Sequence, residues 1–274
     1  MKYVWMFGIA GIVACFSWMA VPLFQLIQKI EDETICKSCE QYSDCFAMKE
    51  LFSGKCNYMS EWMLVSFVQI RKRCSHIEHT PIYIKVLYFI LSMVFFWVSL
   101  WSRGINIIGF TYGISAMIFF FLSVVDWNTQ YIPLECNIII LICGLIHLFA
   151  DFSNWGDYLI GLIAVSGFLF LVDRIAAPVL AKRYPGEEMD SVIGDGDIKL
   201  MAATGLLLGW KLNFLALGIG CIAGSVIHLI RMKIKGSNAR LALGPYLSLG
   251  VYITMICGEQ LVSWYLDMMG YIPY

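Results

Sequence analysis

Long apolar segments separated by short polar ones constrain this fold more than any other feature of the sequence. A helix needs about 20 apolar residues to cross a bilayer, and most of these segments approach or exceed that length. Hydrophobic residues make up 59% of the 274-residue chain and charged residues only 14%, which excludes an ordinary soluble domain. We therefore expect an all-α polytopic membrane protein with about eight spans. The expected spans are residues 3–26, 82–101, 105–125, 137–150, 158–181, 198–210, 213–230 and 241–265.

One long polar segment, residues 28–80, interrupts this pattern after the first expected helix, residues 1–27. We expect it to form a small cytosolic domain, with residues 81–274 as the membrane core. A disulfide framework is not expected in the cytosol, so metal binding is the competing interpretation of its cysteines. Five of the ten cysteines of the chain lie in this segment: Cys36, Cys39, Cys45, Cys56 and Cys74.

The distribution of lysine and arginine predicts the orientation. If residues 28–80 are cytosolic, the loops 126–136, 182–197 and 231–240 are cytosolic as well, and together they hold most of the basic residues. The opposite side keeps only Lys2, Arg103 and Lys211, and its loop 151–157 is acidic. The positive-inside rule then places both termini outside, on the periplasmic side of a bacterial membrane, with residues 3–26 as a retained span. No basic tail supports a nucleic-acid partner; membrane lipid is the expected surrounding.

Two aspartates are the candidate reactive groups. Asp197 lies in the stretch GDGDIKL, at the expected beginning of a helix, and Asp126 lies in FLSVVDWNTQYIPLECN, at the end of another. Both are placed at the cytosolic membrane face. Two carboxylates that meet can share one proton and divide the acid and base roles of an aspartic protease. The alternative for each is helix capping: Asp126 on the segment that follows it, Asp197 on its own helix.

Other ionisable groups have simpler expected roles. We expect Asp195 to face solvent, and Asp173, beside Arg174, to have a salt-bridge partner. His147 and His228 lie in or at the end of apolar spans, where a histidine is more often a packing group than a catalyst.

Four motifs, in order along the chain, resemble those of the type IV prepilin peptidases, a family of bacterial inner-membrane aspartyl proteases. They are Asp126 followed by Ile132-Pro133, the GDGDIKL stretch, MAATGLLLGW after it, and LGPY from Leu243 to Tyr246. The resemblance implies that Asp126 and Asp197 are the catalytic pair. Substrate-binding or loop-supporting roles are expected for Gly194, Gly196, Lys199, Glu187, Glu188, Pro133 and Pro245.

The resemblance also implies a reaction and its substrates. Members of the family cleave type IV prepilins or pseudopilins on the cytosolic side, after the glycine that ends a short basic leader and before a hydrophobic helix. Proteolysis needs no cofactor, whereas many members also methylate the new N-terminus with S-adenosylmethionine. Glu187 and Glu188, with Asp190, could attract the basic leader; a solvated loop is the alternative.

The cysteine-containing segment departs from the family pattern. Many members carry two CxxC pairs, a set suited to tetrahedral zinc. Here the first pair is intact, but Met59 and Ile77 stand where Cys56 and Cys74 would need a partner. A structural zinc site and a domain without zinc are therefore equal alternatives, and no residue can be matched to a methyl-donor site. The zinc ligands would be Cys36, Cys39, Cys56 and Cys74, with Cys45, His76 and His79 as substitutes.

Two other function classes compete with a peptidase. A transporter could use Asp126 and Asp197 to bind a cation or a proton, and a membrane methyltransferase could keep them as vestiges. No inverted repeat is evident and the pair sits at a membrane face, which argues against the transporter.

Overall fold

The computed structural model describes residues 82–130, 132–183, 191–235 and 242–270, together with Gly8 and Gly11. All regular structure in these residues is helical, as the sequence predicts. The first expected span and the cysteine-containing segment lie outside the described residues, so the total of eight spans and the cytosolic domain stay predictions. The helices are α6 (Ile82–Arg103), α7 (Ile107–Thr129), α8 (Leu134–Ala150), the 3-10 turn η2 (Phe152–Asn154), α9 (Trp155–Arg183), α10 (Asp195–Leu208), α11 (Trp210–Lys235) and α12 (Gly244–Met268).

Within the part of the chain that the structure describes, four apolar stretches are long enough to cross a membrane: Val86–Arg103, Ile107–Trp127, Phe152–Leu180 and Trp210–Lys233. The 17-residue α8 and the 14-residue α10 are shorter than a bilayer requires. This agrees with the two short spans expected from the sequence. α10 begins three residues before the expected residue 198, so the acidic GDGD loop is partly helical.

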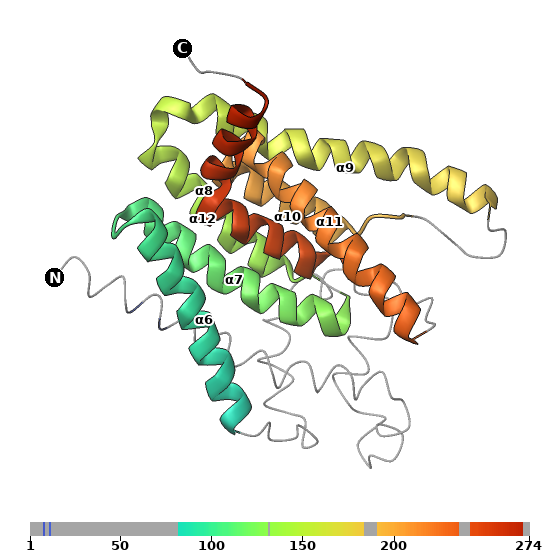
Figure 1. Ribbon diagram of the computed structural model, residues 1–274, viewed down its shortest axis with the longest axis horizontal. Helices are drawn as coiled ribbons and strands as arrows, with labels where there is room; N and C mark the ends of the chain where they lie inside the picture. Colours follow the sequence, from blue (N-terminus) through green and yellow to red (C-terminus); the bar gives the residue numbers. More distant parts are fainter. Residues whose placement is uncertain are drawn as a thin grey trace, which may run out of the picture.

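Figure 1 shows the helices packed as a bundle in which neighbours in sequence lie side by side: α6 with α7, α9 with α10, and α11 with α12. α10 packs against α8, α9 and α11, and α7 packs against α8 and α12. The core includes the fully buried side chains of Leu122, Met201 and Leu247. α6 and α9, in contrast, expose large apolar side chains such as Trp101 and Ile163, as lipid-facing helices do.

Close backbone contact at glycines joins the helix pairs. A Cβ added to Gly161 of α9 would overlap the carbonyl oxygen of Gly205 in α10, and one added to Gly205 would overlap that of Gly161. In the same way, a Cβ on Gly250 of α12 would overlap the carbonyl oxygen of Ala216 in α11. Apolar helices associate in lipid through such small residues, because packing has to replace the hydrophobic effect there.

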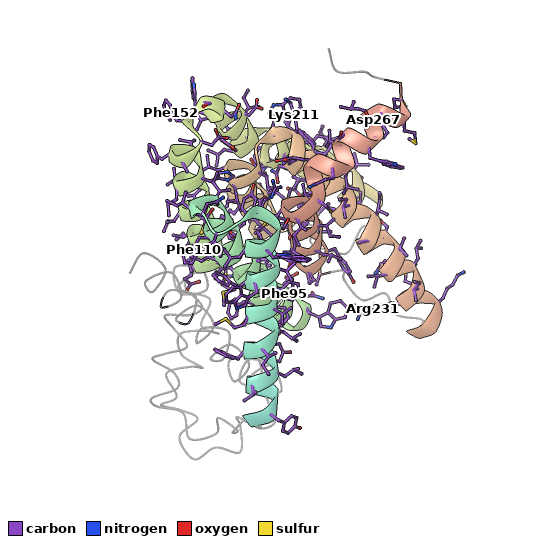
Figure 2. The ribbon with its side chains drawn as sticks, turned by 60° about the vertical axis from the view of Figure 1, so that its left-hand side comes forward. Phe95, Phe110, Phe152, Lys211, Arg231 and Asp267 are labelled. Atoms are coloured by element: carbon purple, nitrogen blue, oxygen red, sulfur yellow. The ribbon has the colours of Figure 1, made fainter. Side chains whose placement is uncertain are left out.

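The directions of the helices give the bundle two distinct ends. α7 finishes, and α8, α10 and α12 begin, at what we call the aspartate end. The opposite, far end holds η2 and the junction of α10 with α11 at Gly209. In Figure 2, Phe152, Lys211 and Asp267 lie together at the far end, and Arg231 lies toward the other end of α11.

Candidate active site

Asp126 is buried near the end of α7, with 4% of its surface exposed. Its Oδ2 accepts a hydrogen bond of 2.9 Å from the backbone N–H of Gly244, the first residue of α12. The carboxylate therefore caps α12, 118 residues away in sequence, and not the segment that follows it, as the capping alternative supposed. A helix N-terminus stabilises a negative charge placed in this way.

Only glycine fits at position 244, because Asp126 and Ile132 leave no space for a side chain. A Cβ at this position would stand 2.6 Å from Oδ2 of Asp126 and 3.2 Å from Cδ1 of Ile132. Pro245 follows in the first turn of α12, where its missing N–H costs no hydrogen bond. The LGPY motif thus forms the beginning of α12, where the N–H of Gly244 bonds the carboxylate of Asp126.

Asp197 is buried in the first turn of α10, with 9% of its surface exposed. Its Oδ1 is buried and has no hydrogen-bond partner among the described residues. The N-cap of α10 is Gly194, and no side chain caps this helix. The side chain turns back toward this glycine, since a Cβ on Gly194 would lie 3.1 Å from Oδ2 of Asp197. Helix capping therefore does not account for Asp197.

The two carboxylates converge around Ile132. A Cβ on Gly196, next to Asp197, would lie 2.8 Å from the Cβ of Ile132, and a Cβ on Gly244, the hydrogen-bond partner of Asp126, would lie 3.2 Å from Cδ1 of Ile132. Burial, and after it the negative charge of Asp126, disfavour ionisation of Asp197. Two buried carboxylates within electrostatic reach do not both ionise comfortably, so the pair is suited to sharing one proton.

Ile132 lies shortly after the end of α7. α7 ends at Gln130 in the left-handed conformation, and its N–H bonds the carbonyl oxygen of Asp126 at 2.8 Å. Pro133 is extended, with φ −62° and ψ 133°, and leads directly into α8. The Ile-Pro pair therefore places a buried side chain against Gly244, which bonds Asp126, and against Gly196, which precedes Asp197.

Asp173 corrects one sequence expectation. Its Oδ1 accepts hydrogen bonds from the backbone N–H groups of Val192, at 2.7 Å, and Ile193, at 2.9 Å, instead of serving mainly as a salt-bridge partner. The carboxylate thus holds the segment that leads into Gly194 and Asp197. Sequence analysis missed this role, although an aspartate within an apolar run was itself a signal.

The remaining predicted residues fall into two groups. Asp195 and Lys199 are exposed near the start of α10, so Asp195 faces away from the pair as expected. Glu187, Glu188 and every predicted zinc ligand lie outside the described residues. Among the described ones, no group of three or more histidine, cysteine or acidic residues could hold a metal ion.

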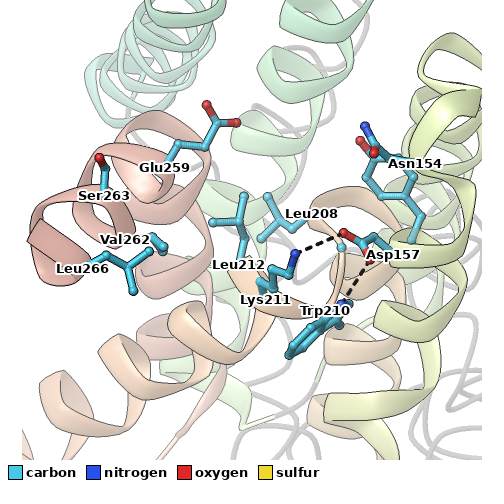
Figure 3. Close-up of a pocket in the computed structure, with 12 residues that line it drawn as sticks. Asn154, Asp157, Leu208, Trp210, Lys211, Leu212, Glu259, Val262, Ser263 and Leu266 are labelled. Atoms are coloured by element: carbon cyan, nitrogen blue, oxygen red, sulfur yellow. Dashed lines mark hydrogen bonds and ion pairs between the residues drawn. The ribbon is translucent and has the colours of Figure 1, made fainter. Parts of the chain in front are cut away.

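The far end has its own cavity, of about 420 Å³, lined by the ends of α10 and α12. Figure 3 shows Asp157 beside it, bound to Lys211 (Nζ–Oδ2 3.6 Å) and to the indole Nε1 of Trp210 (3.2 Å). Leu208, which lines this cavity, is about 16 Å along the axis of α10 from Asp197. The cavity is therefore separate from the carboxylate pair.

Packing and hydrogen bonds account for the other ionisable residues near the far end. His147 is buried, with Nδ1 2.8 Å from the carbonyl oxygen of Leu207 and its ring edge-on to Tyr112, which confirms its packing role. Hydrogen bonds from Asn154 and Tyr158 hold the pKa of Asp151 below its ordinary value.

Comparisons with known proteins cover the same part of the chain. Residues 113–229, which contain both aspartates, match the model of the type IV leader peptidase family. A Pseudomonas aeruginosa protein named prepilin leader peptidase/N-methyltransferase is 29% identical over 174 residues, 62% of this chain and 55% of that protein. An Aeromonas hydrophila protein of the same name is 30% identical over 148 residues, 53% of this chain and 48% of that protein.

A third protein of this name, from Pectobacterium carotovorum subsp. carotovorum, is 27% identical over 275 aligned positions, 92% of this chain and 93% of that protein. The chain aligns with about half the length of the first two relatives. No solved structure matches it.

Proposed function

We propose that this chain, whose residues 113–229 match the model of the type IV leader peptidase family, is a member of that family and a membrane aspartyl endopeptidase. Its catalytic pair is Asp126 and Asp197. The observation that supports this most is the convergence of two buried carboxylates, from helices far apart in sequence, at one end of the bundle. No described residue favours a transporter.

The surroundings of the two carboxylates suggest how they divide the reaction. The N–H of Gly244 favours a negative oxygen on Asp126, whereas Oδ1 of Asp197 has no partner among the described residues. The shared proton is then expected on Asp197. Asp126 takes a proton from the attacking water while Asp197 donates one to the oxygen of the scissile carbonyl. Collapse of the tetrahedral gem-diol breaks the C–N bond: Asp126 gives its proton to the departing amine, and Asp197 takes back a proton from a hydroxyl of the gem-diol as the new carboxyl group forms.

The proposed substrates are type IV prepilins or pseudopilins, cut on the cytosolic side of the inner membrane after the glycine that ends a basic leader. Both chain termini would then be periplasmic. Glu187 and Glu188 would attract the leader through their charge. Replacing both with lysine should weaken processing most at low ionic strength; processing that is equal to wild type at every salt concentration would remove this role.

A co-expression experiment tests the peptidase activity. The full chain is produced with a type IV prepilin in a host that lacks its own prepilin peptidase, and the N-terminus of the product is read by mass spectrometry. Wild type should cut after the glycine, and Asp126→Asn and Asp197→Asn should each lower the rate by about 10³-fold or more. Asp195→Asn is the matched control, because it removes an exposed carboxylate two residues from Asp197 and should stay active. Processing that survives both substitutions contradicts the proposal.

Two further properties rest on the sequence alone. Metal analysis of the purified protein, with Cys36 and Cys39 replaced by serine as the control, decides whether zinc is bound. A mass increase of one methyl group on the cleaved product, in the presence of S-adenosylmethionine, would establish methyl transfer. We assign no residue to the methyl donor.

A further inference from the structure

The cavity of about 420 Å³ at the far end of the bundle has no part in the proposed reaction. Its volume falls within the range of about 300–1,000 Å³ that is usual for small-molecule sites. Figure 3 shows Asp157 of α9 and Glu259 of α12 on opposite sides of it, with Lys211 of α11 between them. Most of the side-chain surface of Glu259 and of Lys211 is exposed, so a ligand can enter without any opening of the bundle.

Exposed tryptophans place this cavity at the boundary between membrane and water. Trp101, Trp155 and Trp264 lie toward the far end on three different helices, and each exposes half of its surface or more. Tryptophan concentrates at this boundary, where its ring lies among lipid head groups. Trp155 is two residues from the lining residue Asp157, and Trp264 adjoins another lining residue. The cavity therefore opens where lipid head groups lie.

The charged side chains that line the cavity carry both signs. Asp157 and Glu259 supply two carboxylates, and Lys211 supplies an ammonium group. A head group that is only anionic would meet two like charges here, and one that is only cationic would meet Lys211. A zwitterionic head group, in contrast, can place its anion beside Lys211 and its cation beside the carboxylates. The pattern of charge therefore favours a zwitterion.

The hydrogen-bonding groups of these side chains are not used up by their contacts with one another. Nζ of Lys211 lies 3.6 Å from Oδ2 of Asp157, whereas a charge-assisted hydrogen bond measures about 2.7–2.9 Å. An ammonium group has several N–H donors, so Lys211 can also bind a phosphate oxygen. The indole of Trp210 holds Asp157 in place at 3.2 Å, and a carboxylate can accept about four hydrogen bonds. A phosphate and a primary ammonium group would both find partners.

The rest of the lining distinguishes between zwitterions. A quaternary choline group donates no hydrogen bond and prefers aromatic faces, whereas this cavity offers it carboxylates. Nζ of Lys211 already covers the ring of Trp210, 5.5 Å from its centroid. The cavity also has an apolar wall, which a soluble zwitterion would leave in contact with water. The wall includes Leu208, Leu212, Val262 and the exposed Leu266.

We propose that this far-end cavity binds one phospholipid through a head group that combines a phosphate with a primary ammonium group, as in phosphatidylethanolamine. Lys211 binds the phosphate, and Asp157 and Glu259 accept hydrogen bonds from the ammonium group. The apolar wall contacts the beginning of the acyl chains, which leave past Leu266 toward the bilayer. The lipid joins α9, α11 and α12 at the end of the bundle opposite the carboxylate pair, and its binding stabilises the folded state. The proposal does not depend on the peptidase activity.

Native mass spectrometry of the full-length protein, freed of lipid in detergent, tests the head group. The protein is titrated with phosphatidylethanolamine, phosphatidylcholine and phosphatidylglycerol that have identical acyl chains. The first phosphatidylethanolamine should bind about tenfold more tightly than either of the others. Equal affinities, or tighter binding of phosphatidylglycerol, overturn the proposal. Glycerophosphoethanolamine, which has the head group without the chains, should not displace the lipid; displacement at equal concentrations would assign the cavity to a soluble zwitterion and overturn the proposal as well.

Two pairs of variants connect the binding to this cavity. Glu259→Gln removes a lining carboxylate and should abolish the preference for phosphatidylethanolamine over phosphatidylcholine. Asp267→Asn removes an exposed carboxylate about two turns later on α12 and should keep that preference.

The second pair leaves the charged residues intact. Leu266→Trp fills the apolar wall and should weaken phosphatidylethanolamine binding about tenfold. Leu249→Trp replaces a leucine of similar exposure on the same helix, outside the cavity, and should bind like wild type. If Glu259→Gln does not fold, this pair decides the question alone. Wild-type binding by Leu266→Trp, or equal losses in Leu266→Trp and Leu249→Trp, contradicts a lipid site in this cavity.

Discussion

At the scale of single residues, the site depends on two glycines, Gly244 and Gly196, because a Cβ atom at either position would collide with a neighbour. Gly244 allows its N–H to reach Asp126, and Gly196 allows Ile132 to pack beside the first turn of α10. In each case a Cβ would stand under 3.0 Å from the neighbouring residue. Gly244 is therefore explained by its contact with Asp126 and Gly196 by its contact with Ile132, and not only by loop flexibility.

Gly244→Ala should lower the cleavage rate by about 100-fold, because the new methyl group displaces the Asp126 carboxylate and misplacement by about 1 Å has an effect of that size. The control is Gly218→Ala on α11, where a Cβ would meet no atom within 4 Å. Cleavage rates of membranes with equal amounts of each variant provide the measurement. Equal rates for the two variants would show that Gly244 does not position Asp126.

Residue types could predict the pair but not its contacts. Asp126 and Asp197 were identifiable because aspartates at the ends of apolar runs are costly unless used. The bond from Gly244 to Asp126 and the two bonds to Asp173 join residues 118, 19 and 20 positions apart. Such hydrogen-bond partners depend on how the helices pack. From the sequence, the alternatives were therefore local: a helix cap for Asp126 and a salt bridge for Asp173.

At the scale of elements, Asp173 on α9 fixes the segment before α10. Asp173→Ala leaves the N–H groups of Val192 and Ile193 without their acceptor, so we expect a loss of about 1–3 kcal/mol of stability and a lower kcat. Asp173→Asn keeps an acceptor oxygen and should retain most of the activity. Thermal unfolding in detergent and cleavage kinetics measure both. An Asn variant as impaired as the Ala variant would mean that charge, and not hydrogen bonding, is what this residue supplies.

Helix pairing makes a separate prediction. The Cβ of a Gly161→Ala variant overlaps the backbone of Gly205, so separating α9 from α10 should lower the free energy of unfolding by about 1–3 kcal/mol. Gly156→Ala, on the same helix with no atom within 4 Å of the new Cβ, serves as control. Identical melting temperatures for the two variants would exclude close packing at Gly161.

Element bounds followed from hydropathy to within a few residues. The apolar run expected from residue 198 begins three residues after α10 does, and Asp197 lies in the first helical turn, at the helix beginning where the sequence placed it. Hydropathy locates the apolar run but not the first helical turn, because Asp195 and Gly196 are not apolar. Short apolar helices such as α8 and α10 are stabilised by neighbours on several sides.

At the scale of the whole molecule, basic residues of the described chain collect toward the aspartate end, where α9 ends with Lys182 and α11 with Lys233 and Lys235, whereas the far end keeps only Arg103 and Lys211. By the positive-inside rule, this division predicts an orientation with the aspartate end in the cytosol. A cysteine at exposed Lys211 should react with a membrane-impermeant maleimide in intact cells, and one at exposed Asp195 only after permeabilisation. Wild type gives the background from native cysteines. The reverse labelling pattern would invert the topology.

A comparison of single and double variants tests most directly whether Asp126 and Asp197 act as one catalytic unit, as we propose. Prepilin cleavage by the full chain is measured for Asp126→Asn, Asp197→Asn and the double variant. If the carboxylates share one proton and one reaction, each single substitution should lower the rate about as much as both together. Two partial losses that multiply in the double variant would show that the carboxylates act independently and would contradict the account.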